Sequence, residues 1–156
     1  MNPDIEVIAY EPEHAVEILA RPHDVKNVKA NPDFEAWAKV NALGPAWTGR
    51  RISDGKILAC AGVRILWPGC GEAWAIFCDP EVVEYKYKKE AYVYILTYLK
   101  RVIEDYDLRR VQALVRADIP IAVKYIEQLG FEREGLLRKY GREGEDQYMY
   151  ALILEG

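Results

Sequence analysis

Three lysines stand close together at the predicted start of the longest helix. Lys86, Lys88 and Lys89 fall within the first two turns of a helix predicted for residues 84–106. Lysine near a helix N-terminus opposes the helix macrodipole, which costs roughly a few tenths of a kcal/mol unless an anion is bound there. Two interpretations remain open: the lysines bind an anionic group, or they belong to a solvated helix start flanked by glutamates.

The cysteines and histidines indicate little metal or redox chemistry. Cys60, Cys70 and Cys78 form no C-x-x-C pair, so neither a zinc ribbon nor a disulfide framework is expected. Cys78 could serve as a nucleophile, but a cysteine in an apolar strand is more often inert packing. The two imidazoles, His14 and His23, lie near the N-terminus without a matching ligand cluster, so we expect no metal site.

The composition limits the class of protein. The chain has 156 residues, of which 51% are hydrophobic and 29% charged, so we expect one globular domain over residues 1–156. A net charge of -4 gives no general attraction for nucleic acid. The N-terminus lacks a signal-peptide pattern, and no apolar run reaches the roughly 18 residues of a membrane span. We therefore expect a cytoplasmic protein that binds neither nucleic acid nor membranes.

The period of the apolar residues predicts the elements that must position these side chains. Alternation predicts strands, and a repeat of three to four residues predicts helices. The Asp54-Gly55 pair predicts a hairpin turn, Asp118 is a candidate helix cap, and Gly130 ends the helix that follows. In chain order we expect a strand at 5–10, a helix at 13–19, a helix opening at 31–33 and closed by 44–45, strands at 46–53, 57–67 and 72–78, a helix at 84–106, a strand at 109–115, a helix from 120 to 129, and strands from 131 and at 147–154.

This order predicts an α/β fold with a central mixed sheet of six to seven strands and about four helices. The helix at 84–106 should make the strands at 72–78 and 109–115 parallel neighbours. Apolar residues on both faces of the 72–78 strand place it centrally in the sheet. The long helix should pack a stripe from Ala91 to Tyr106 inward.

Both the element order and one segment resemble the GNAT acyltransferase family. Residues 121–131, which end in Leu129-Gly130-Phe131, resemble the helix-to-strand signature of that family. Residues 132–138 resemble its continuation in the branch that acetylates the N-termini of ribosomal proteins. The resemblance implies acetyl-CoA as co-substrate, bound where the parallel strands ending at Cys78 and Val115 separate.

The pyrophosphate loop departs from the family pattern. Family members usually carry Gln/Arg-x-x-Gly-x-Gly/Ala after the fourth strand, whereas residues 79–90 contain no glycine. The three lysines could supply point charges to the diphosphate instead; in the solvated-helix interpretation, the cofactor site is lost. The residues that the resemblance places at the cofactor are Phe77, Cys78, Asp79, Lys86, Lys88, Lys89, Asp118 and Ala122.

Direct acetyl transfer needs a base for the amine and an acid for the leaving thiolate. Glu72 begins the fourth strand, where family members often place a base that acts directly or through water; the alternative is a strand-end carboxylate on the surface. Asp118 is a weaker candidate for the base, because helix capping explains it. Many family members carry a tyrosine acting as the acid at the position of Ile126. Tyr125 is offset from that position by about 100° around the helix, which should turn its side chain away from the same spot. Tyr125 is therefore only a weak candidate for the acid.

The resemblance implies an N-acetyltransferase acting on a primary amine, either a protein N-terminus or a small molecule. Tyr140 and the 138–146 turn would overhang the acceptor, or they form a solvated loop. The alternative is a non-catalytic binding or structural module. The glycine-free loop, the fourth strand with its tryptophan and the lysine-rich helix start resemble the small GNAT-like internal virion proteins of tailed phages, in which case the protein would be virion-associated. A homodimer is left open.

Overall fold

The chain folds around one seven-stranded sheet. The structure is a computed structural model that describes residues 4–19, 34–78 and 85–155. The elements are β1 (Ile5–Ala9), α1 (Pro12–Leu19), α3 (Phe34–Asn41), β2 (Ala46–Arg51), β3 (Ile57–Trp67), β4 (Cys70–Phe77), α4 (Tyr85–Asp105), β5 (Arg110–Arg116), α5 (Pro120–Gln128), β6 (Glu132–Leu137) and β7 (Gln147–Ile153). This is the predicted order of strands and helices.

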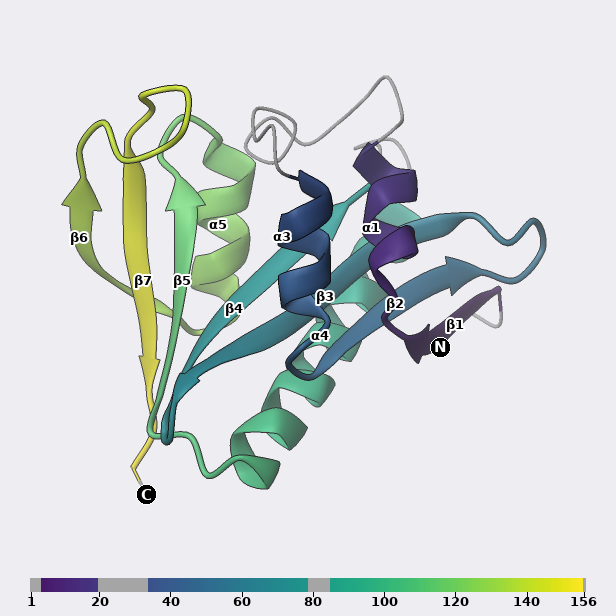
Figure 1. Ribbon diagram of the computed structural model, residues 1–156, viewed down its shortest axis with the longest axis horizontal. Coiled ribbons are helices and arrows are strands. Elements are labelled where there is room, and N and C mark those ends of the chain that lie inside the picture. Colours follow the sequence, from purple (N-terminus) through teal and green to yellow (C-terminus); the bar gives the residue numbers. More distant parts are fainter. Residues whose placement is uncertain (1–3, 20–33, 79–84, 156) are drawn as a thin grey trace.

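The sheet has the order β1-β2-β3-β4-β5-β7-β6. β4 and β5 are parallel, and the other neighbouring strands in the described sheet are antiparallel. β4 is the fourth of seven strands, which confirms its predicted central place. α1 and α3 cover one face of the sheet, and α4 and α5 lie behind the other (Figure 1). We call these the α1–α3 face and the α4–α5 face.

Each face holds its own hydrophobic core. Strand residues alternate between the faces, so one strand supplies both cores. On the α1–α3 face, the core includes Ala15, Ile18, Ala38, Cys60, Ile76 and Cys78. On the α4–α5 face, it includes Leu99, Val102, Val111, Ala113, Ile126 and Tyr150.

Two turn predictions are confirmed. Asp54 Oδ1 accepts the Lys56 N–H at 3.1 Å, and Gly55 has a φ of 72°, so the hairpin uses the aspartate and the glycine as expected. Gly130 follows α5 with a φ of 97°, in the left-handed region that glycine tolerates best.

Two other predictions are wrong. The first is that Asp118 caps α5. Ile119 occupies the N-cap position of α5 without a side-chain cap, and the carboxylate of Asp118 is hydrogen-bonded to Arg116 instead. A charged guanidinium two residues away on β5 competes successfully with the helix N–H groups. The long helix ends at Asp105, so Tyr106 lies beyond it and is 47% exposed rather than packed inward.

None of the helices in the described part of the chain meets the length and hydropathy that a membrane-spanning helix requires. Within the same residues, no group of three or more histidine, cysteine, aspartate or glutamate side chains is arranged to hold a metal ion.

Candidate functional site: the opening between β4 and β5

β4 and β5 are paired over only part of their length. The register joins Cys70 to Arg110, Gly71 to Val111, and Glu72 to Gln112. β4 continues to Phe77 and β5 to Arg116, yet no residue beyond Glu72 pairs with β5. Figure 1 shows the two strands diverging from this point. The separation expected from the family resemblance is therefore present, and Glu72 lies at its vertex.

Two alanines lie on the α4–α5 face of the separated part of β4. Ala73 packs into the core on the α4–α5 face, and Ala75, two residues on, points to the same side. Ala75 is nevertheless exposed, although β4 is the central strand. A central strand is normally covered on both faces, so α4 and α5 leave the sheet accessible here. An extended ligand could reach β4 at this position.

The far end of the opening carries an aromatic pair. The ring of Phe77 meets that of Tyr125, from α5, edge to face at 5.8 Å between centroids. The Tyr125 hydroxyl is buried without a hydrogen-bond partner, and burial raises its pKa well above the usual value. The helical offset therefore does not carry Tyr125 away from β4, because its long side chain reaches the separated part of the strand. Ile126 is buried in the adjoining core.

Glu72 is an anchored carboxylate, not a surface strand end. Its side chain is 12% exposed and forms an ion pair with Arg64, the residue directly opposite on β3. Its other oxygen accepts a hydrogen bond from Gln112 Nε2 at 3.1 Å. Both oxygens thus have a donor. Each oxygen keeps a second lone pair, so the carboxylate can still accept a proton.

The chain of polar contacts continues across β5 to the edge of the sheet. Arg110 Nε donates to Gln112 Oε1 at 3.1 Å, and the Arg110 guanidinium binds Glu134 with contacts of 3.0 and 2.7 Å. This bidentate pair raises the pKa of Arg110 and lowers that of Glu134, chiefly through the side-chain hydrogen bonds. The polar contacts join four strands beside the paired half of β4 and β5.

A second charged cluster holds the β6–β7 loop against the end of β5. Arg116 is 4% exposed and binds both oxygens of Asp118 at 2.8 Å. Its guanidinium also lies 3.4 Å from Glu143 and 4.0 Å from Glu145 in the loop. The loop at 138–146 is therefore anchored, rather than simply solvated.

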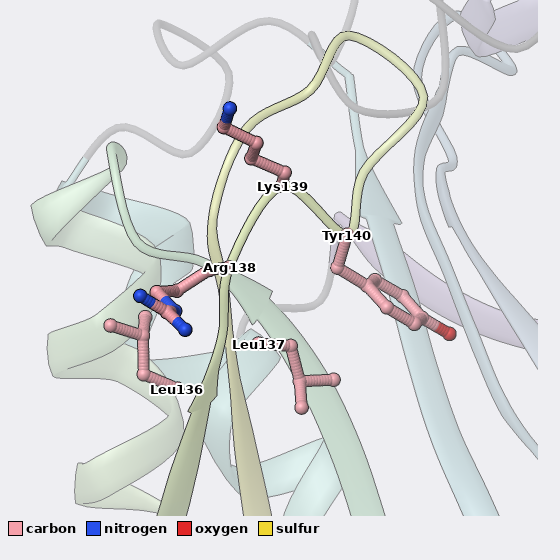
Figure 2. Close-up of a pocket in the computed structure, with 5 residues that line it drawn as sticks. All are labelled: Leu136, Leu137, Arg138, Lys139 and Tyr140. Carbon is pink, nitrogen blue, oxygen red and sulfur yellow. The ribbon is translucent and has the colours of Figure 1, made fainter.

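The loop carries exposed side chains above this anchor. They line a hollow of about 680 Å³ whose described lining runs from Leu136 to Tyr140. Leu137 and Tyr140 point to one side of the loop, whereas Leu136 and Arg138 point toward α5 (Figure 2). Tyr140 is exposed, as an acceptor contact would require.

The other predicted cofactor residues fall at several places. Cys78 is buried in the core on the α1–α3 face, as inert packing predicts. Ala122 is half-buried on α5. Lys86, Lys88 and Lys89 lie in the first two turns of α4, as predicted, and Lys89 is exposed. Asp79 lies outside the described residues, and so do the side chains of Lys86 and Lys88.

Sequence reasoning missed the residues that hold Glu72 and the loop. Arg64 is the single charged residue in β3, an apolar central strand, and that isolation was a usable signal. Gln112 and Arg116 lie on the opposite side of β5 from Val111, Ala113 and Val115 and could have been grouped by alternation. Their partners on β4 and in the loop depend on strand pairing, which the sequence does not give.

The fold is shared with solved acetyltransferases. No family model matches the sequence, and no curated protein matches it. A GNAT-family acetyltransferase from Bacillus anthracis superposes with a TM-score of 0.70 at 18% identity, over 96% of this chain and 95% of that one. Ribosomal-protein-S5-alanine acetyltransferase from Vibrio fischeri gives 0.72 at 16% identity, over 99% and 96%. The chain has the GNAT fold. A variant spermidine N-acetyltransferase from Vibrio cholerae gives 0.71 at 15% identity, over 97% and 95% of the two chains.

Proposed function

We propose that this protein is an N-acetyltransferase that moves an acetyl group from acetyl-CoA to a primary amine by direct attack. The observation that carries the proposal is the separation of β4 from β5 beyond Glu72, with an accessible alanine at the centre of the sheet. The GNAT fold of the chain supports the same reaction class.

The unpaired edge of β4 supplies the backbone groups of the site. β4 bonds to β3 along one edge up to Phe77, whereas its other edge loses β5 after Glu72. Backbone N–H and C=O groups on that edge can bind an extended amide-containing arm as a neighbouring strand would. The same N–H groups can stabilise the negative charge that develops on a thioester oxygen under attack.

Glu72 and Tyr125 carry the proton transfers in this proposal. The amine nitrogen forms a bond to the thioester carbon, and its surplus proton passes through water to the Glu72 carboxylate, because Glu72 lies at the vertex and Tyr125 at the far end of the opening. The carbon–sulfur bond then breaks, and the Tyr125 hydroxyl gives its proton to the leaving sulfur. Because burial raises the pKa of Tyr125, the hydroxyl carries its proton at neutral pH. Solvent afterwards restores both residues.

The lysines at the start of α4 bind the cofactor diphosphate in this proposal. Their helix position supports it, because the first turn of α4 holds no acidic residue. Lysine provides point charges where a glycine-rich loop would provide backbone N–H groups. Phe77 and Ala122 would contact the pantetheine arm, and the exposed Tyr140 would contact the acceptor.

Acetyl-CoA binding tests the proposal first. At about 100 times its Kd, a ligand stabilises the folded protein by roughly 2.7 kcal/mol, and we expect the melting temperature to rise by several degrees. Release of CoA thiol should then depend on an amine, tested with spermidine, amino acids and peptides with free N-termini. The lysine triple alanine variant at positions 86, 88 and 89 should lose most of the thermal shift. A full shift in that variant would contradict the diphosphate assignment.

The second candidate is a GNAT-like module without catalysis, associated with a phage virion. The absence of glycine from residues 79–90 favours it, because the usual phosphate cradle is not encoded. The same experiment separates the two: neither a thermal shift nor amine-dependent thiol release is expected from such a module.

A further inference from the structure

Unpartnered polar atoms gather where α3 meets the sheet. Seven buried side-chain nitrogen or oxygen atoms in the described residues have no hydrogen-bond partner. Four of the seven belong to Asn41, Arg64 and Trp74: both amide atoms of Asn41, Nε of Arg64 and Nε1 of Trp74. Asn41 is the most enclosed of the three, with 0% of its surface exposed.

Strand register places two of these residues on the α1–α3 face beside Glu72. Arg64 lies directly opposite Glu72, and Trp74 lies opposite Gly62 in the next position on the same face. Trp74 cannot easily turn its ring away, because Tyr10 and Trp37 pack against it at 5.2 and 5.3 Å between centroids. The indole N–H is therefore held in the protein interior.

α3 brings Asn41 to the same face. Trp37 contacts Trp74, and Asn41 is four residues further along α3, on the same side of the helix. The turn after α3 rests on β3, since a Cβ on Gly44 would lie 2.4 Å from the Val63 carbonyl oxygen and 3.5 Å from Arg64 Cα. In the chain, Asn41 thus lies between Trp37, which contacts Trp74, and Gly44, which lies against Arg64.

The chemistry of these atoms is that of a hydration site. Arg64 Nε and Trp74 Nε1 are donors, and the Asn41 amide offers donors and one acceptor. A buried polar group without a partner is destabilising, and buried water usually satisfies such groups with two to four hydrogen bonds. One bridging water can accept from Arg64 Nε and Trp74 Nε1 and donate to the Asn41 amide oxygen.

We propose that Asn41, Arg64 and Trp74 bind an internal water that fixes the Arg64 guanidinium, so that Asn41 and Trp74 act as positioning residues for Glu72. Arg64 holds Glu72 from β3, while Gln112 holds it from β5, with Arg110 and Glu134 behind. The importance of Glu72 as a base rests on the proposed function, but the water site and its effect on Glu72 do not.

Two variants separate this role from simple packing. Asn41→Leu replaces the amide by an apolar side chain of similar size, and Trp74→Phe removes the indole N–H while keeping a ring. Lys39→Leu, at an exposed position on α3, is the matched control. A crystal structure of the wild type should show a water bonded to Asn41 and Trp74. The carboxyl carbon of Glu72, followed by NMR during a pH titration, reports on its environment without any substrate.

Either variant should loosen the Arg64 guanidinium against the Glu72 carboxylate, so the titration midpoint of Glu72 should rise relative to the wild type. Lys39→Leu should leave it unchanged. An interior without density for the water, or a midpoint that does not move in both variants, overturns the proposal. If the midpoint moves while acetyl-CoA gives no thermal shift, the positioning role is upheld and only the proposed function fails.

Discussion

The two ends of the β4–β5 pair differ in what lies beside them. Where the strands begin, three residue pairs join them and the contacts of Glu72, Gln112 and Arg110 extend across the sheet. Beyond Glu72 the strands separate, and the α4–α5 face of β4 carries Ala73 and the exposed Ala75. Polar side chains bridge the strands in the paired half, and an accessible alanine lies in the other. The site thus forms where pairing stops.

Filling the open half should have the largest effect. Ala75→Phe places a ring beside the unpaired edge of β4, and we expect the thermal shift with acetyl-CoA to disappear. Because Ala75 is exposed, the melting temperature without ligand should stay within a few degrees of the wild type. Ala42→Phe, at another exposed alanine, is the control and should keep the full shift. Unchanged acetyl-CoA binding in Ala75→Phe would mean that the opening is not the cofactor site.

Removing the charge of Glu72, at the vertex of the opening, should lower turnover more than it weakens acetyl-CoA binding. Glu72→Gln keeps the side-chain shape but removes the proton acceptor, so kcat should fall roughly 100-fold or more. The thermal shift with acetyl-CoA should remain, because the opening itself is intact. Glu132→Gln, at an exposed position on β6, serves as the control. Amine-dependent thiol release at the wild-type rate would remove Glu72 from the mechanism.

The cluster at the end of β5 should matter for stability. Arg116→Met leaves the buried Glu145, which is 8% exposed, without its cation. Breaking a buried pair from one side costs about 3 kcal/mol, which corresponds to a fall of roughly 10 °C in melting temperature for a chain of this size. Arg142→Met, in the same loop but exposed, should change it little. Equal melting curves for the two variants would show that the loop is not anchored through Arg116.

The ion pair between Arg110 and Glu134, the outermost contact of the closed half, should contribute least to stability. Glu134→Gln removes the ion pair to Arg110 at the exposed sheet edge and should cost less than about 1 kcal/mol. Since the pairing lowers the pKa of Glu134 below its ordinary 4.5, the stabilisation is present above that pH and is lost as the pH falls through the lowered value. Melting curves of both proteins should therefore differ at pH 7, approach each other below pH 4.5, and converge once the pH is below the lowered pKa. A constant difference at all pH values would exclude the ion pair as its cause.

Much of the fold was predictable because it is encoded by residues that are close together in the sequence. The Asp54-Gly55 turn, the end of α5 at Gly130 and the apolar residues on both faces of β4 each follow from a few neighbouring residues. Prediction failed at Asp118, which binds Arg116 in the folded chain, and at Tyr106, which the folded chain leaves exposed. The helix-cap prediction for Asp118 considered only the N–H groups at the start of α5. It did not consider the guanidinium of Arg116, which binds Asp118 in the fold.

The candidate site was predicted only in outline. Glu72 and Tyr125 came from the family resemblance, whereas Arg64, Gln112 and Asn41 came from the structure. Their partners lie on other strands or on α3, at separations along the chain that no short motif spans. Asn41 in particular reads as an ordinary polar residue at a helix end, and its complete burial is a property of packing.

By itself, the sequence determined the elements, their order and the parallel crossover, because periodicity, turn residues and connection lengths act over short distances along the chain. The tertiary structure alone decided where β4 leaves β5, which carboxylate each arginine binds, and that Ala75 stays accessible at the centre of the sheet. These features depend on strand register and on how helices cover the sheet, and both are set by packing between residues far apart in the sequence.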